Sequence, residues 1–170
     1  MNNKVHNFSA GPSILPDKVF EQSSAAINNF NGKGLSILEI SHRSKDFIDV
    51  LDEARSLALD IAELDPTKYA CIFLQGGASM QFLMTAYNFL NNKAAYINTG
   101  SWSTKAIKEA KLFGNVYEIA SSSDKNFNYI PKNISINEVY DYLHITSNNT
   151  IFGTQFQSFP DTSCPLIADM

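Results

Sequence analysis

The sequence predicts an α/β fold, in which a mostly parallel sheet is covered by helices on both faces. Two observations lead to this prediction. Short apolar runs of strand length alternate along the chain with longer segments whose apolar residues recur at helical spacing. Turns rich in glycine or small polar residues separate these segments, as expected for strand–helix–strand units joined by right-handed crossovers. The sequence contains no internal repeat and no low-complexity tract.

The composition is that of one globular core. Of the 170 residues, 44% are hydrophobic and 18% are charged, which suits a domain of ordinary size. The formal net charge is −4, and the 13 lysines and arginines form no basic block, so we expect no nucleic-acid partner. No apolar run reaches the roughly 18 residues of a membrane helix, and residues 1–7 lack the apolar core of a signal peptide. We therefore expect a cytoplasmic protein with no membrane partner.

Two cysteines, Cys71 and Cys164, are present, and their spacing matches no metal-binding or redox motif. We expect both to be reduced thiols with a structural role. The sequence thus predicts no metal site.

The first part of the chain is predicted to hold two helices. Residues 7–13 are turn-prone and lead to a helix near Pro16, since proline suits a first helical turn. Gly-Lys-Gly at residues 32–34 ends this helix, and an extended or irregular segment follows. Over residues 46–64 a long apolar stripe predicts the second helix, which Pro66 stops.

The second part is predicted to alternate between strands and helices. Residues 71–74 form a short apolar run directly before a glycine pair, which predicts a buried strand. Ser135, with Glu138 three residues later, indicates a capping box for a helix through Leu143. The remaining pattern predicts strands over residues 94–98, 115–120, 144–150 and 165–169, helices over 82–90 and 102–113, and loops over 121–133 and 153–164.

The turn after the first predicted strand has the outline of a phosphate site. Gly76 and Gly77 can adopt backbone angles closed to other residues, and the small Ala78 and Ser79 let backbone N–H groups approach an anion. Free N–H groups and the positive dipole end of the following helix favour a phosphate there. A strand-to-helix turn without a ligand is the alternative, because glycine pairs are common in such turns.

Three more predicted site residues follow strand ends: Trp102, Thr150 and Asp169. Ligands of parallel sheets bind beyond the carboxyl ends of the strands, so these residues and the glycine turn are expected to converge. A suitable ligand carries a phosphate for the turn, a flat ring for Trp102 and a basic group for Asp169. Pyridoxal phosphate has all three.

Each residue has a chemical role towards such a ligand and a plainer alternative. Asp169 would keep the pyridine nitrogen protonated, Trp102 would stack on the ring, and Thr150 would hydrogen-bond the ring oxygen. The alternatives are packing for Trp102 and an ordinary loop hydroxyl for Thr150. Asp169 is the stronger indication, because a carboxylate that directly follows an apolar strand is costly to bury without a partner.

A second group of candidates precedes the long helix. Arg43 offers a planar fork for carboxylate or phosphate oxygens, and His42 adds a second donor when protonated. Ser9 and Arg43 stand on non-helical segments, from which both can reach into a cleft. By charge pattern alone, a solvated surface pair is the alternative for His42 and Arg43.

Six segments carry a family resemblance, namely residues 7–12, 39–44, 74–82, 98–103, 149–153 and 168–170. In order and spacing they resemble the phosphoserine aminotransferases. The resemblance implies the large domain of the type I fold of pyridoxal-phosphate enzymes, with residues 1–15 as an N-terminal loop segment and residues 16–170 as the first part of that domain. The C-terminal part and the small domain would be absent.

The implied reaction is a transamination between O-phosphoserine and 2-oxoglutarate, which gives 3-phosphohydroxypyruvate and glutamate in L-serine biosynthesis. A second substrate, phosphohydroxythreonine of pyridoxine biosynthesis, is left open. Trp102 and Asp169 would be catalytic, and Ser9, His42 and Arg43 would bind the substrate. The implied cofactor contacts are Gly77, Ala78, Ser79, Trp102, Thr150 and Asp169.

One part of the family pattern is missing from the 170 residues. The Schiff-base lysine of the family stands in a Gln-Lys-Asn context beyond the Ala168-Asp169 segment, and no lysine here has such a context. We therefore expect this chain alone to be inactive, and the complete protein to be a homodimer or to use a second polypeptide. Two other interpretations stay open: a non-catalytic module that binds pyridoxal phosphate or phosphate, and another enzyme of the same fold, such as a cysteine desulfurase. Residues 39–44 argue against the desulfurase.

Overall fold

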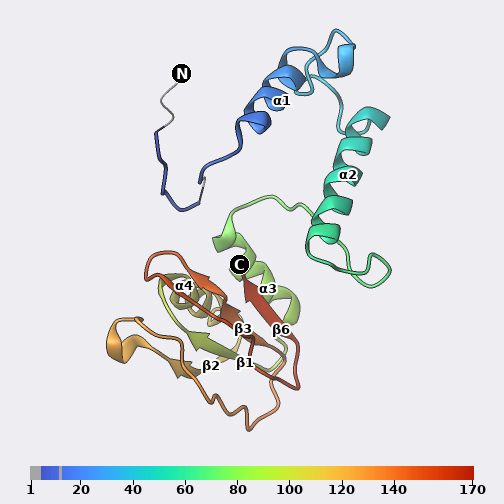
Figure 1. The fold of residues 1–170 in the computed structure, drawn as a ribbon. Coiled ribbons are helices and arrows are strands. Elements are labelled where there is room, and N and C mark those ends of the chain that lie inside the picture. The colour runs from blue at the N-terminus through green and yellow to red at the C-terminus, as the bar shows by residue number, and fades with distance from the viewer. Residues whose placement is uncertain (1–4, 12) are drawn as a thin grey trace. The chain divides into compact units, whose positions relative to one another are not determined.

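The computed structural model describes residues 5–11 and 13–170 (Figure 1). The chain divides into two compact units, residues 1–74 and 75–170. No helix in the described ranges is long and apolar enough to cross a membrane.

The first unit contains the two helices that the sequence predicted, α1 (Asp17–Asn28) and α2 (Lys45–Ile61). Between them, a short 3-10 turn, η1 (Phe30–Gly32), reverses the chain. The segment after the turn runs back along α1, where the backbone N–H of Ile37 donates to the carbonyl of Ala26 at 3.1 Å. Phe30 is the one buried side chain among the described residues of this unit, so the apolar stripes of both helices stay largely open.

The second unit is built on a four-stranded parallel sheet with the strand order β2-β1-β3-β6. This confirms the predicted α/β class with a mostly parallel sheet and helices. A small antiparallel hairpin, β4 with β5, follows β3. The elements are α3 (Ala78–Phe89), β1 (Lys93–Asn98), α4 (Ser101–Ala110), β2 (Asn115–Ser121), the 3-10 turn η2 (Ser123–Lys125), β3 (Leu143–Thr146), β4 (Asn148–Asn149), β5 (Thr154–Gln155) and β6 (Leu166–Asp169).

The core of this unit lies on both faces of β1 and β3. On one face Tyr96 and Tyr142 pack against apolar residues of α3 and α4. Their hydroxyl groups are 2.7 Å apart, and burial raises the pKa of Tyr96 strongly, so both rings stay neutral. On the other face Leu143 and Ile145 pack beneath the loops that contain Ile134 and Phe156.

The predicted strand over residues 71–74 is wrong. The segment has no regular secondary structure and pairs with no strand in the described part of the chain, and Ile72, Phe73 and Leu74 are each more than half exposed. A strand needs a neighbouring backbone to satisfy its N–H and C=O groups, and an apolar run by itself does not supply one. Cys71 in this segment is half-buried, and both it and Cys164 are free thiols.

The predicted helix over residues 135–143 is also wrong. Residues 135–142 have no regular secondary structure and Leu143 begins β3, while the N–H of Asp141 donates to the carbonyl of Lys93 in β1 at 2.8 Å. The Asp141 carboxylate accepts from the backbone N–H groups of Asn91, Asn92 and Lys93. Glu138, the expected capping residue, instead forms an ion pair with Lys93. These long-range contacts outweigh the local capping pattern.

Candidate functional site

The carboxyl edge of the parallel sheet gathers the predicted cofactor residues of the second unit. Trp102 follows β1, Thr150 follows β3 and β4, and Asp169 is the last residue of β6. Parallel strands end at the same edge, so the three positions lie along it. Helix α3 leads into β1 through a short connection and so runs back against it, which brings its first residues to this edge as well.

The glycine turn before α3 has two glycines with different roles. Gly76 has φ +92°, and a Cβ there would lie 2.8 Å from Cβ of Met80, so this position requires glycine. Gly77 has φ −91°, and a Cβ there would meet nothing within 4 Å. No side chain caps the helix, and in the described part of the chain no group accepts from the N–H of Ala78 or Ser79. The turn is therefore an open cradle with two free donors.

Trp102 and Thr150 contact each other. The indole Nε1–H donates to Oγ1 of Thr150 at 3.2 Å, across 48 residues of sequence. The threonine hydroxyl keeps its own hydrogen, because it acts here as an acceptor. Nζ of Lys105 lies 4.6 Å from the indole ring centroid, so a cation covers one face of the ring. The pair thus presents an aromatic face and a free hydroxyl donor together.

Asp169 opens into a cavity of about 290 Å³. Its carboxylate accepts from Oγ1 of Thr146 at 3.5 Å, a long hydrogen bond. Burial raises the pKa of Asp169, and the Thr146 hydroxyl offsets this in part. A cationic partner in the cavity would favour the charged carboxylate. The cavity is lined by Gln81, Phe82, Thr85, His144, Ile167, Ala168, Asp169 and Met170.

Three of those lining residues belong to α3, the helix that begins at the glycine turn. The phosphate cradle and the Asp169 carboxylate are therefore linked through the first two turns of one helix. A larger cavity, about 470 Å³, lies between residues 130–134 and 155–161, but it contains none of the predicted site residues. The smaller cavity is the better candidate, since it holds the carboxylate.

His144 was not predicted, and it lines the same cavity. Its side chain is 2% exposed and its Nδ1 has no hydrogen-bond partner in the described part of the chain. The ring stacks on Tyr96 at a centroid distance of 4.8 Å and meets the edge of Phe82. Burial lowers the pKa of His144 to about 4, so the imidazole is neutral at physiological pH. Side chains alternate between the two faces of a strand, so Tyr142, His144 and Thr146 lie on one face of the sheet. This alternation is the sequence signal that could have identified His144.

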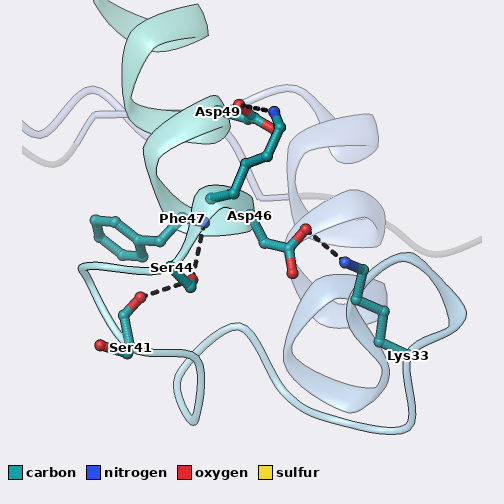
Figure 2. Close-up of polar contacts among 7 residues, drawn as sticks. Lys33, Ser41, Ser44, Asp46, Phe47 and Asp49 are labelled. Carbon is teal, nitrogen blue, oxygen red and sulfur yellow. Dashed lines mark hydrogen bonds and ion pairs between the residues drawn. The ribbon is translucent and has the colours of Figure 1, made fainter.

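The predicted substrate residues belong to the first unit, where His42 and Arg43 form an exposed turn just before α2. Figure 2 shows how Ser44 holds this turn: its hydroxyl donates to the Ser41 carbonyl at 2.7 Å and accepts from the N–H of Phe47. The N–H of Arg43 donates to Oγ of Ser41 at 3.2 Å. Both side chains are thus displayed on a fixed turn.

Two ion pairs flank the same helix start, Lys33 with Asp46 at 2.5 Å and Lys45 with Asp49 at 2.7 Å (Figure 2). Ser9 lies on the N-terminal segment, where its N–H donates to Oδ1 of Asn7 at 2.9 Å. Its side chain is exposed. In the described residues no group of three or more His, Cys, Asp or Glu side chains could hold a metal ion.

Comparison with known proteins gives consistent matches. The aminotransferase class-V family model matches residues 5–163. A phosphoserine aminotransferase of Flavobacterium johnsoniae is 60% identical over 169 residues, which are 98% of this chain and 48% of that protein. The solved phosphoserine aminotransferase of Bacillus circulans subsp. alkalophilus superposes with a TM-score of 0.93 at 45% identity, over 99% of this chain and 48% of that one.

A third match is the phosphoserine aminotransferase of Trichomonas vaginalis, whose crystal structure has PLP bound. It superposes with a TM-score of 0.88 at 31% identity, over 97% of this chain and 47% of that one. The chain spans about half the length of the curated relatives it matches.

Proposed function

This chain belongs to the class-V aminotransferase family, and from that membership we propose that the complete protein is a phosphoserine aminotransferase. It would transfer an amino group between O-phosphoserine and 2-oxoglutarate, with pyridoxal phosphate as cofactor. The observation that carries the proposal is the set of ring, hydroxyl and carboxylate that Trp102, Thr150 and Asp169 form along one sheet edge. In keeping with the family resemblance, we propose a cytoplasmic homodimer in which residues 16–170 begin the large domain.

The residues of the second unit fit pyridoxal phosphate. The free N–H groups of Ala78 and Ser79 suit a phosphate, and Gly77 leaves space for its close approach. Thr150 has a hydroxyl hydrogen for the ring oxygen. Asp169 is a half-buried carboxylate whose pKa is raised, and a protonated pyridine nitrogen would stabilise its charge. When bound, the cofactor supplies a sink for the electrons released as the amino-acid substrate loses its α proton.

The chain's own residues then have distinct tasks. Trp102 orients the ring by stacking, and Thr150 fixes its rotation through the hydroxyl. Asp169 holds a proton at the ring nitrogen. His42 and Arg43 bind the anionic groups of the substrate, and Arg43 does so with a bidentate fork. Ser9 adds a further hydroxyl contact to the substrate.

The two glycines provide a test of the phosphate cradle. Gly77→Val is expected to weaken binding of pyridoxal phosphate to the full-length apoenzyme by about tenfold or more, because the new side chain fills the open space in front of the N–H groups. Its effect on folding should be small, since a Cβ at this position meets nothing. The measurement is a cofactor titration followed by absorbance.

Gly76→Ala is the matched comparison. It should lower the thermal midpoint of unfolding, because its φ is +92° and its Cβ would clash with Met80. An unchanged cofactor affinity in Gly77→Val would remove this turn from the site.

A substitution at Arg43 tests its proposed role in substrate binding. Arg43→Lys is expected to raise the KM for O-phosphoserine about tenfold while kcat changes less, because lysine keeps the charge and loses the bidentate fork. Arg55→Lys is the control, since Arg55 pairs with Asp52 within α2 at 3.2 Å. Steady-state kinetics of both variants in the full-length enzyme would show the difference. Equal KM values for the two variants would identify Arg43 as a surface arginine without a substrate role.

A further inference from the structure

Asn149, the residue before Thr150, is almost fully enclosed, with 1% of its surface exposed. Its amide Nδ2 donates to Oγ1 of Thr99 at 3.1 Å and to Oγ1 of Thr154 at 3.2 Å. Thr99 is on the turn after β1, whereas Thr154 begins β5, the strand that pairs with β4 of Asn149 in the hairpin. One amide group therefore joins two loops that are 50 residues apart in sequence.

The two loops have no space between them at this point. A Cβ at Gly100 would lie 2.8 Å from Oδ1 of Asn149 and 3.1 Å from Cδ2 of Phe152. The first of these loops is also fixed from within, because Oγ of Ser103 accepts from the N–H groups of Thr99 and Gly100, both at 2.9 Å. A side chain that is buried, tightly enclosed and hydrogen-bonded through its amide N–H₂ group has one orientation.

Each end of this link is close in sequence to one member of the exposed pair: Trp102 is in the first turn of α4, and Thr150 is in the turn after β4. Trp102 comes three residues after Thr99, and Thr150 directly follows Asn149. The indole donates to the threonine hydroxyl at 3.2 Å, at the surface, where water competes for the same groups. An exposed hydrogen bond of this kind is weak by itself. The link through Asn149 is buried and joins the same two segments just beyond the paired strands β1 and β3.

We propose that Asn149 is a positioning residue, which acts through Thr99 to hold Trp102 and Thr150 in the arrangement that receives the cofactor ring. The inference rests on the proposed function for its role in cofactor binding. The positioning of the pair is a property of the chain itself. With the indole N–H as donor to Thr150, the threonine hydrogen stays free for the ring oxygen.

The test uses the full-length apoprotein labelled with ¹⁵N-tryptophan. The indole N–H resonance of Trp102, assigned by its loss in Trp102→Phe, reports the hydrogen bond to Thr150 without any cofactor or turnover. Thr99→Val is nearly isosteric and cuts the link between the loops, while Asn149 keeps its bonds to Thr154. Asn149→Ala removes both sides of the link. Asn148→Ala, at the exposed neighbouring position of β4, is the control.

Thr99→Val and Asn149→Ala are each expected to shift the Trp102 indole resonance and to speed its exchange with water. Both should weaken binding of pyridoxal phosphate about tenfold, the factor that corresponds to one lost hydrogen bond. Asn148→Ala should change neither quantity. If Asn149→Ala does not fold, as judged by circular dichroism, the Thr99→Val result decides.

An indole resonance that is unchanged in a folded Thr99→Val variant would overturn the proposal. A shifted indole with unchanged cofactor affinity would overturn the role of Asn149 in cofactor binding. If the parent protein itself binds no pyridoxal phosphate while the indole still shifts in the variants, the proposed function fails and the positioning of the pair stands.

Discussion

Replacing Asp169 with asparagine is expected to lower kcat of the complete enzyme about 100-fold or more, a loss of roughly 3 kcal/mol or more in transition-state stabilisation. Asparagine has the same shape but cannot hold a proton at the ring nitrogen of the bound cofactor. The protein already favours a proton near this carboxylate, because burial raises the pKa of Asp169. Removing the negative charge removes the group that would stabilise the protonated ring.

Cofactor affinity should fall less than kcat, since the phosphate cradle and the Trp102–Thr150 pair are untouched. The measurements are steady-state turnover and a cofactor titration on the full-length variant. Asp161→Asn makes the same chemical change at an exposed carboxylate of the second unit and should leave both quantities unchanged. Turnover of Asp169→Asn within a few fold of the parent would show that this carboxylate does not act on the cofactor.

Elements whose signals are local could be predicted from the sequence. The apolar stripes of α1, α2, α3 and α4 mark these helices within about a turn of their observed ends. Strands β1, β2, β3 and β6 were also identified, because an apolar run in an alternating chain has few other structures available. The predicted end of β3 at residue 150 is wrong: β3 ends at Thr146, and residues 148–149 form β4 of the hairpin.

The two incorrect elements depended on distant partners. Residues 71–74 have a strand pattern without a neighbouring strand in the described ranges. Residues 135–143 have a helix-capping pattern, but Asp141 binds three successive N–H groups at the start of β1. Neither outcome follows from short-range spacing, because the first depends on the absence of a neighbouring strand among the described residues and the second on contacts that cross about fifty residues of chain.

The residues of the candidate site also differ in whether the sequence could identify them. Residues at strand ends, such as Trp102 and Asp169, could be proposed because topology predicts where strand ends meet. Asn149 and His144 could not be proposed from the sequence. The role of a buried amide or imidazole depends on the side chains that surround it in the folded protein. The hydrogen bond from Asn149 to Thr99 and the stacking of His144 on Tyr96 appear only when β1 and β3 lie side by side.

His144 should also make the stability of the second unit depend on pH. In the folded chain its pKa is about 4, below its ordinary value of 6.5, and burial is the cause. Between these two values the unfolded chain binds more protons than the folded chain, so the free energy of unfolding rises with pH. The full contribution is present above about pH 6.5 and is lost as the pH falls towards 4. His144 contributes at most about 3 kcal/mol to the free energy of unfolding, and about 2 kcal/mol of this should be lost between pH 7 and pH 5.

His144→Phe isolates this contribution. Phenylalanine keeps an aromatic ring against Tyr96 and has no proton to gain, so the variant should lose less stability than the parent when the pH falls from 7 to 5. The other groups near the imidazole, the Asp169 carboxylate and the hydroxyls of Tyr96 and Tyr142, are the same in both proteins. Asp169 has a raised pKa and acts in the opposite direction, so only the difference between the two proteins measures the contribution of His144.

The measurement is urea unfolding at both pH values, with His6→Phe as the control at an exposed histidine. Equal pH dependence in the parent and in His144→Phe would mean that His144 becomes charged without cost in the folded protein, and that the imidazole is hydrated.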